Sequence, residues 1–378
     1  MKHAIGRILR GLGTVLLFLV AGLCFAPTLV PPFLDRLYYE GPRSGHFDGE
    51  RFFNPDDAPT PTRRGRRSFF SRWAGSAERA RWPEHVPVTP TVPPRSVEDD
   101  AMRVTWIGHS TVLVQTQGIN ILTDPIWSDI ASPVTFAGPR RVRAPGVRFE
   151  DLPRIDLVLV SHNHYDHMDL PTLRRLWERD RPLIVTSLGN DTILRNAGIE
   201  SRAEDWGGSV PVSMPCGPPG APVLCAPQGE VIVERVHHWG SRWFTDRNRA
   251  LWSGFTVRLP GGNIFFAGDT GWGDGSWVRE AARHGPFRLA IIPIGAYQPR
   301  DVMRGSHVNP EEAMAIFEGL NPARALGVHW GTFQLTFEPI DQPWQRIAAL
   351  GRARGLAAER FVAVQAGQGF SVPPLPGR

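Results

Sequence analysis

The feature that most constrains this chain is a run of potential metal ligands packed into six residues, namely His162, His164, Asp166 and His167. The run directly follows the apolar stretch 156–160, which is typical of a buried strand. In an extended backbone His162 and His164 point to the same side. Imidazole and carboxylate groups together suit zinc, iron or manganese better than calcium. The sequence therefore predicts a transition-metal site where a loop leaves the edge of a sheet.

One loop cannot complete two metal sites, so further ligands are expected at the ends of other strands. A histidine or aspartate at the edge of an apolar run is costly unless it is paired. Three such residues share this position after a predicted strand, which favours ligation. They are His238 after 231–236, Asp269 after 263–267 and His329 after 325–328.

The order of predicted elements indicates an α/β protein. Strand pairs come first, strands and helices then alternate, and this happens twice. Such an order implies two sheets packed on each other with helices outside both, a four-layer αβ/βα sandwich. The predicted strands are 103–107, 111–115, 119–123, 156–160, 183–186, 231–236, 254–259, 263–267, 289–293, 325–328 and 361–364, and the predicted helices are 171–179, 191–197, 276–284, 310–318 and 345–354.

Residues 1–34 are predicted to be a membrane anchor helix or a signal segment. Lys2, Arg7 and Arg10 precede an uncharged stretch from residue 11 to 34, which is long enough for the ~20 residues of a membrane span. A cleaved signal peptide is the alternative, but Pro27 directly after the best cleavage site disfavours it. We expect a single-pass anchor in a bacterial-type inner membrane, with the positive flank in the cytoplasm and the catalytic domain in the periplasm.

Residues 35–100 are predicted to be a Pro/Arg-rich linker that wraps the domain 101–378. The linker holds an arginine run at 63–67, interpreted either as a solvated tether or as a contact with anionic lipid. No basic helix or aromatic signature indicates a nucleic-acid partner. Cys216 and Cys225 flank a Pro/Gly-rich loop and are expected to pair only if the domain is exported.

These residues resemble the metallo-β-lactamase superfamily, in which His-x-His-x-Asp-His and a later His, Asp and His bind two metal ions. The resemblance runs from about residue 102 to the C-terminus. Within the superfamily, the sequence is more specifically similar to the branch that contains N-acyl-phosphatidylethanolamine-hydrolysing phospholipase D and the sugar-phosphate lactonases. The phrases that carry it are Trp106-Ile107-Gly108-His109-Ser110-Thr111, residues 162–169, His238-Trp239, residues 251–255, 265–271 and 292–297, His307-Val308-Asn309-Pro310-Glu311-Glu312-Ala313 and His329-Trp330-Gly331-Thr332.

The resemblance implies two divalent metal ions, with zinc expected. It places His162, His164 and His238 on the first ion, Asp166, His167 and His329 on the second, and Asp269 as the bridge. His238 is preferred to its neighbour His237 because the His-Trp pair matches the family phrase. The sequence departs from the family pattern in the Pro/Gly-rich segment 214–228, which leaves the local loop conformation open.

Three further residues are expected to support the chemistry. His307 is a candidate catalytic acid or substrate hydrogen-bond donor, or else a capping or core histidine. Asp169 is expected to orient a ligand imidazole through its second ring nitrogen. His109 is either a similar support or a buried histidine at a strand end.

The resemblance makes the chain a dinuclear metal-dependent hydrolase, with a phosphodiesterase of the phospholipase D type as the first hypothesis. A metal-bridging hydroxide would attack the phosphorus of N-acyl-phosphatidylethanolamine or a related phospholipid. A membrane and its phospholipid are then the expected partners. A lactonase or phosphorylated-metabolite hydrolase is the alternative within enzymes, and a non-catalytic metal-binding envelope protein is the alternative outside them.

Overall fold

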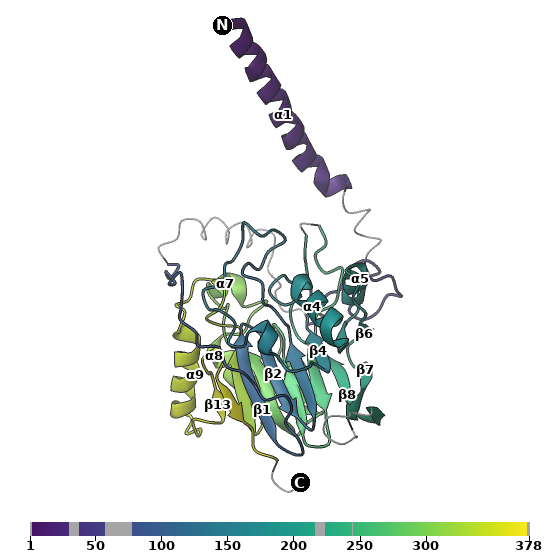
Figure 1. Ribbon diagram of the computed structural model, residues 1–378, viewed down its shortest axis with the longest axis vertical. Coiled ribbons are helices and arrows are strands. Elements are labelled where there is room, and N and C mark those ends of the chain that lie inside the picture. Colours follow the sequence, from purple (N-terminus) through teal and green to yellow (C-terminus); the bar gives the residue numbers. More distant parts are fainter. Residues whose placement is uncertain (1, 30–37, 57–77, 216–223, 244, 376–378) are drawn as a thin grey trace.

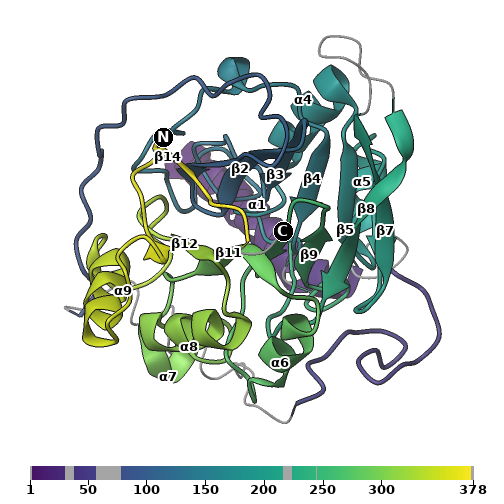
Figure 2. The ribbon, with the colours of Figure 1, turned by 90° about the horizontal axis from the view of Figure 1, so that it is seen from below.

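Two β-sheets packed face to face form the body of the protein, and helices cover the outer face of each (Figures 1 and 2). The computed structural model describes residues 2–29, 38–56, 78–215, 224–243 and 245–375. Within these residues each sheet has seven strands. The predicted sandwich of two sheets with helices outside both is confirmed.

The first sheet has the strand order β14-β1-β2-β3-β4-β5-β6. Its early strands pair antiparallel as hairpins, and β3 to β6 are parallel. Parallel neighbours end at the same edge of the sheet, so the loop after β4 leaves from a shared edge. The bounds are β1 Met102–Gly108, β2 Thr111–Thr116, β3 Ile119–Thr123, β4 Leu157–Val160, β5 Leu183–Ser187, β6 Arg202–Glu204 and β14 Gly369–Ser371.

The second sheet repeats this plan with the order β13-β12-β11-β10-β9-β8-β7. Its strands β7 to β10 are antiparallel and β10 to β13 are parallel. The bounds are β7 Ser209–Pro215, β8 Leu224–Glu234, β9 Gly254–Arg258, β10 Asn263–Phe266, β11 Phe287–Pro293, β12 Arg324–Val328 and β13 Phe361–Val362.

The helices divide between the two outer faces. Helices α4 and α5 lie outside the first sheet, and α6, α8 and α9 lie outside the second (Figure 2). Helix α8 begins with a capping box, in which Asn309 and Glu312 satisfy each other's backbone N–H groups. The bounds are η2 Phe149–Asp151, α4 Leu170–Asp180, α5 Asn190–Asn196, α6 Ser276–Ala282, α7 Arg300–Met303, α8 Pro310–Leu320 and α9 Gln342–Ala353.

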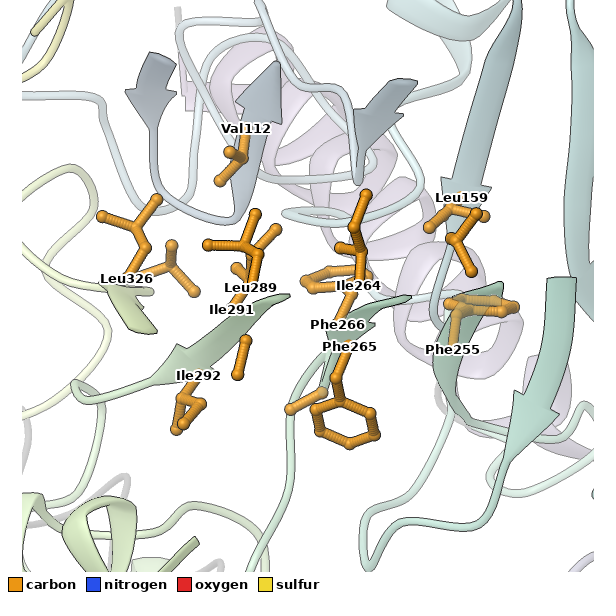
Figure 3. Close-up of a cluster of buried hydrophobic side chains, with 14 of the residues drawn as sticks. Val112, Leu159, Phe255, Ile264, Phe265, Phe266, Leu289, Ile291, Ile292 and Leu326 are labelled. Atoms are coloured by element: carbon orange, nitrogen blue, oxygen red, sulfur yellow. The ribbon is translucent and has the colours of Figure 1, made fainter. Parts of the chain in front are cut away.

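The main core lies between the sheets. Side chains alternate along each strand, so on β11 Leu289 and Ile291 face the first sheet while Ile292 faces the helices (Figure 3). From the first sheet Val112 faces Leu289 and Ile291, and Leu159 faces Phe255 of β9 (Figure 3); all of these side chains are at most 1% exposed. This packed interior holds the strand ends, and the loops that follow them, in fixed positions.

Five elements of the sandwich were not predicted from the sequence, namely η2, β6, β7, β14 and α7. Strand β8 also begins at Leu224, well before the predicted residue 231, and pairs with β7 from Pro215 onwards. The described residues of the Pro/Gly-rich segment, 214–215 and 224–228, therefore belong to these two paired strands. Residues 216–223 lie outside the described residues, so the predicted Cys216–Cys225 pair lies outside them too.

Residues predicted as the membrane anchor form the helix α1 (Lys2–Leu29), which stands clear of the sheets in Figure 1. Large apolar side chains on it are exposed, Leu16 by 62% and Phe18 by 73%. Within the described part of the chain, however, no helix is both long and apolar enough to cross a membrane. The structure thus does not show the predicted transmembrane anchor.

The described parts of the predicted linker, 38–56 and 78–100, contact the domain. In the second part Trp82 Nε1 donates a hydrogen bond to the carbonyl of Glu338 (2.8 Å), and Gln115 Nε2 donates to the carbonyl of Pro94 (2.8 Å). The arginine run at 63–67 lies outside the described residues.

Candidate metal centre

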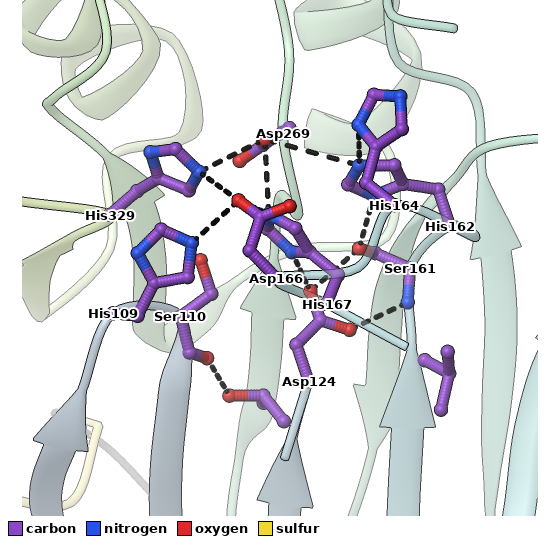
Figure 4. A network of polar contacts seen from close by, with 12 residues as sticks. His109, Ser110, Asp124, Ser161, His162, His164, Asp166, His167, Asp269 and His329 are labelled. Atoms are coloured by element: carbon purple, nitrogen blue, oxygen red, sulfur yellow. Dashed lines mark hydrogen bonds and ion pairs between the residues drawn. The ribbon is translucent and has the colours of Figure 1, made fainter. Parts of the chain in front are cut away.

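The predicted ligands meet where strands of both sheets end (Figure 4). The loop after β4 supplies the four clustered ligands from the first sheet. The second sheet supplies one residue each from the loops after β8, β10 and β12. The residues brought together in this way are His162, His164, Asp166, His167, His238, Asp269 and His329.

The first group of donors consists of His162, His164 and His238. One ring nitrogen from each lies within 4.8 Å of the other two. His162 Nε2 and His164 Nδ1 are 2.8 Å apart. The neighbouring His237 points elsewhere and pairs with Asp56, so His238 is the residue of the two that joins this group.

The second group consists of Asp166, His167 and His329, joined by His109. Asp166 Oδ2 lies 3.4 Å from His167 Nε2 and 3.6 Å from His329 Nε2. It also lies 2.9 Å from His109 Nε2. The His109 ring is 1% exposed, so it supports the Asp166 carboxylate from inside the protein.

Asp269 lies between the two groups. Its Oδ2 is 3.1 Å from the Nε2 atoms of both His167 and His329 in the second group. The same oxygen is 4.0 Å from His162 Nε2 and 3.9 Å from His238 Nε2 in the first group. This central position is the one that a bridging carboxylate requires.

The charges of the second group are strongly coupled. Burial alone would raise the pKa of the Asp269 carboxyl, but His167 and His329 hold it well below its usual range. Burial would likewise lower the pKa of His329, but the Asp269 and Asp166 carboxylates raise it to about 9. Without metal this group therefore combines ionised carboxylates with protonated imidazoles.

The first group behaves differently. Burial is the main cause that lowers the pKa of His162 and His238 well below the usual range and that of His164 to about 3. These rings are therefore neutral at pH 7, which is the form that ligates a metal ion.

The donor set fits two divalent cations. Two buried polar atoms of the donor set have no hydrogen-bond partner, namely His238 Nε2 and Asp269 Oδ1. Buried polar atoms are normally paired, because leaving one unpaired costs about 1–3 kcal/mol. Metal ions would satisfy both atoms, and the mixed imidazole and carboxylate set suits zinc or iron.

Two residues that the sequence interpretation missed hold the ligand loop in place. Asp124, directly after β3, accepts hydrogen bonds from Ser161 N (2.7 Å) and Ser161 Oγ (2.6 Å) and lies 2.6 Å from His167 Nδ1. Arg242 donates to the carbonyls of Asn163 (3.0 Å) and Met168 (2.8 Å), at the two ends of the loop. Like Asp269, Asp124 is a carboxylate directly after an apolar strand, so the same sequence pattern could have identified it.

The prediction for Asp169 is wrong. Its carboxylate accepts hydrogen bonds from Ser128 Oγ (2.8 Å) and Thr172 Oγ1 (2.6 Å) and from the backbone N–H groups of Trp127 and Ser128. It stands at the N-cap of α4, and both of its carboxylate oxygens are taken up by residues 127–128 and Thr172 rather than by a ligand imidazole. The imidazole of His167 is oriented by Asp124 instead.

His307 lies beside the centre. Its Nδ1 is 3.9 Å from Asp269 Oδ2 and has no hydrogen-bond partner, and the residue is 9% exposed. Burial lowers the pKa of His307 to about 3, so the ring is neutral at pH 7. This position leaves a ring N–H available to a bound substrate.

The backbone is strained where the two sheets meet at the centre. His109 and His329 both have left-handed φ angles, 53° and 63°. Residues other than glycine rarely adopt this conformation, which concentrates at functional sites. Here it is held in part by a hydrogen bond from His329 N to the carbonyl of His109 (3.0 Å).

Comparison with known proteins identifies the family of this chain and supports its fold. Residues 119–330 match the family model described as the Beta-lactamase superfamily domain. The chain is 35% identical over 279 residues to the N-acyl-phosphatidylethanolamine-hydrolyzing phospholipase D 1 of Caenorhabditis elegans, covering 71% of this chain and 76% of that protein. It is 32% identical over 257 residues to the mitochondrial N-acyl-phosphatidylethanolamine-hydrolyzing phospholipase D of Saccharomyces cerevisiae, covering 66% and 52%. Igni18, a metallo hydrolase from Ignicoccus hospitalis, superposes with a TM-score of 0.52 at 19% identity, over 72% of this chain and 99% of that one, and this likeness shows the fold alone.

Proposed function

Since the chain belongs to the metallo-β-lactamase superfamily, we propose that this metal-dependent hydrolase is a dinuclear phosphodiesterase of the phospholipase D type. The observation that carries the proposal is the convergence of six other candidate ligand side chains around the Asp269 carboxylate. A bridging carboxylate between two imidazole groups is what a two-metal hydrolytic site needs.

The proposed ligand sets follow the two groups of donors. His162, His164 and His238 would hold the first ion, Asp166, His167 and His329 would hold the second, and Asp269 would serve both. When bound, two cations, zinc in our proposal, would supply an activated water at neutral pH and neutralise charge on a phosphoryl group.

The residues around the ligands then orient them and the substrate. His109 fixes the direction of the Asp166 carboxylate, and Asp124 fixes the His167 ring. His307 is proposed to donate a hydrogen bond from its neutral ring to the phosphodiester. The low pKa of His307 favours this role over that of a proton-donating acid. As water adds to phosphorus, the phosphorus–oxygen bond to the leaving alcohol breaks and that alcohol takes up a proton.

The proposed substrate is N-acyl-phosphatidylethanolamine or a related phospholipid. What supports it is the identity to two proteins named as phospholipases for that lipid, one of them at 35%. The alternatives are a lactonase or phosphorylated-metabolite hydrolase and a metal-binding protein without activity.

The test is a side-by-side assay of purified, metal-loaded protein. The substrates are diacyl N-acyl-phosphatidylethanolamine, a water-soluble glycerophosphodiester and a sugar-phosphate lactone, with Asp269→Asn as the inactive control. We expect N-acylethanolamine and phosphatidic acid as products, and no release by Asp269→Asn. Lactone hydrolysis without phosphodiester cleavage would contradict the proposal, and so would two bound metal ions with no hydrolysis at all.

The inner-membrane location with a periplasmic domain stays a prediction. It is supported by the exposed apolar side chains on α1 and by the positive charges of Lys2, Arg7 and Arg10 before them. Reporters fused after residue 100 and membrane fractionation would test it. An exported domain would also make the Cys216–Cys225 pair testable by mass analysis without reductant.

A further inference from the structure

Residues 38–56, here called the N-terminal arm, run along the outside of the domain and are fixed to it at several points. Phe47 and Phe52 enter the main core and are each 1% exposed. Phe52 N donates to the carbonyl of Asn248 (2.8 Å), and Tyr38 Oη donates to Asp246 Oδ2 (2.5 Å). The arm is therefore packed as part of the domain.

The far end of the arm contacts the loop that carries the metal ligand His238. Asn54 Nδ2 donates a hydrogen bond to the backbone carbonyl of His238 (2.9 Å). Asp56 lies 2.9 Å from Nδ1 of the adjacent His237. The side chains of this second pair are 4% and 2% exposed, so water competes little for the contact. Two consecutive residues of the loop are thus held from the same side.

Asp56 also contacts the loop that carries Asp269. Asp274 N donates to Asp56 Oδ2 (3.1 Å), the oxygen that already faces His237. Gly273, with φ +59°, lies against the same pair. A Cβ added there would lie 2.2 Å from Asp56 Oδ2 and 2.7 Å from His237 Nδ1. One carboxylate therefore meets two ligand loops in a space that has no room for a side chain.

We propose that Asn54 and Asp56 are positioning residues of the metal centre. They lock the loop of His238 to the loop of Asp269, so that the first metal ion finds its donors already aligned. This inference rests on the proposed dinuclear function. Partners that orient a metal ligand from behind typically change its metal affinity about 10- to 100-fold.

Asp56→Asn is the sharpest substitution for testing this role. Both oxygens of the Asp56 carboxylate lie 2.9 Å from His237 Nδ1, so an amide in either orientation places its uncharged NH₂ group against that ring nitrogen in place of an oxygen. Asp48→Asn is the matched control, since Asp48 accepts from Glu50 N and Arg51 N within the arm itself. Asn54→Ala removes the second contact and serves as an independent variant.

The experiment titrates full-length, metal-free protein with Co²⁺ against a competing chelator and follows the absorption of each site. We expect Asp56→Asn to weaken the His162/His164/His238 site about 10- to 100-fold. In Asp56→Asn we expect wild-type values for the affinity of the other site and for the unfolding midpoint of the metal-free protein. In Asp48→Asn we expect wild-type values for both affinities and for the midpoint. Asn54→Ala should weaken the same site.

Two results would overturn the proposal. One is wild-type affinity at both sites in Asp56→Asn. The other is an equal loss at both sites together with a lower unfolding midpoint, because the arm would then only stabilise the fold. Failure of the proposed function would look different, because wild-type protein would bind two ions but cleave no phosphodiester. In that case the metal affinities of the variants would still decide the role of Asn54 and Asp56.

Discussion

Replacing Asp124 by asparagine tests whether a residue outside the ligand set controls metal affinity. Asp124 is fully buried and faces three donors, namely Ser161 N, Ser161 Oγ and His167 Nδ1, at 2.6 to 2.7 Å. A carboxylate can accept from all three, whereas an amide offers one oxygen and two N–H groups. In Asp124→Asn at least one buried donor therefore faces another donor, and the His167 ring loses its fixed orientation.

The size of the effect follows from the contacts. One hydrogen bond to a charged group contributes about 1.5–3 kcal/mol, and ~1.4 kcal/mol corresponds to a tenfold change in affinity. The second metal site should therefore bind about 10- to 100-fold more weakly, in line with other residues that orient metal ligands. Burial raises the pKa of the Asp124 carboxyl, because an ionised group is costly in that position. Removing its charge should thus lower the free energy of unfolding of the metal-free protein by less than it lowers the free energy of metal binding.

A Zn²⁺ titration against a competing chelator measures the affinity, and urea unfolding of metal-free protein measures the stability. Asp156→Asn is the matched control, because Asp156 precedes the same strand β4 whose far end carries the ligand loop and accepts from Asn120 N (2.9 Å). Wild-type affinity in Asp124→Asn would refute the reasoning, as would an equal loss of affinity in Asp156→Asn.

Three further outcomes are expected. Asp269→Asn should lose metal and activity together, because an amide is a poor bridging ligand. Metal analysis and an activity assay of the same preparation check this, and a fully active variant would rule out the dinuclear centre. His307→Ala should lower kcat about 10²- to 10³-fold, the size typical of a lost hydrogen-bond donor, with metal content unchanged; metal lost in proportion to activity would instead make it a ligand. Metal binding at pH 7 should release protons, since the carboxylates raise the pKa of His329 to about 9 and ligation needs the neutral ring. For the same reason the metal affinity should increase as the pH rises toward 9. Calorimetry in buffers of different ionisation enthalpy counts those protons, and a count of zero would contradict the assignment.

The grouping of the candidate ligands could be predicted from the sequence because the pattern that marks them is local. His162, His164, Asp166 and His167 lie in one short run, and the turn that separates them is set by nearby backbone hydrogen bonds such as His167 N to His164 O (3.1 Å). The more distant ligands each follow an apolar strand, and parallel strands of one sheet end at a common edge. The two-sheet architecture follows from the same strand pattern.

The supporting residues depend on contacts between distant segments, which a single sequence does not display. Asp169 and Asp124 are both acids near the ligand loop, yet Asp169 faces the turn at Ser128 while Asp124 reaches back to His167 from another strand. Asn54 and Asp56 lie in a segment whose proline-rich composition predicts only a linker. Their partners are 184 and 181 residues away along the chain.

The division of the ligands between the two sheets also sets an order of events during synthesis. The four ligands after β4 leave the ribosome first, but His238, Asp269 and His329 follow only with the second sheet. Strand β14, which completes the first sheet beside β1, is made later than all of them. A growing chain therefore exposes four of the seven candidate donors long before the other three exist. In the proposed dinuclear centre, the binding of both ions would then be a late step, after the second sheet has closed on the first.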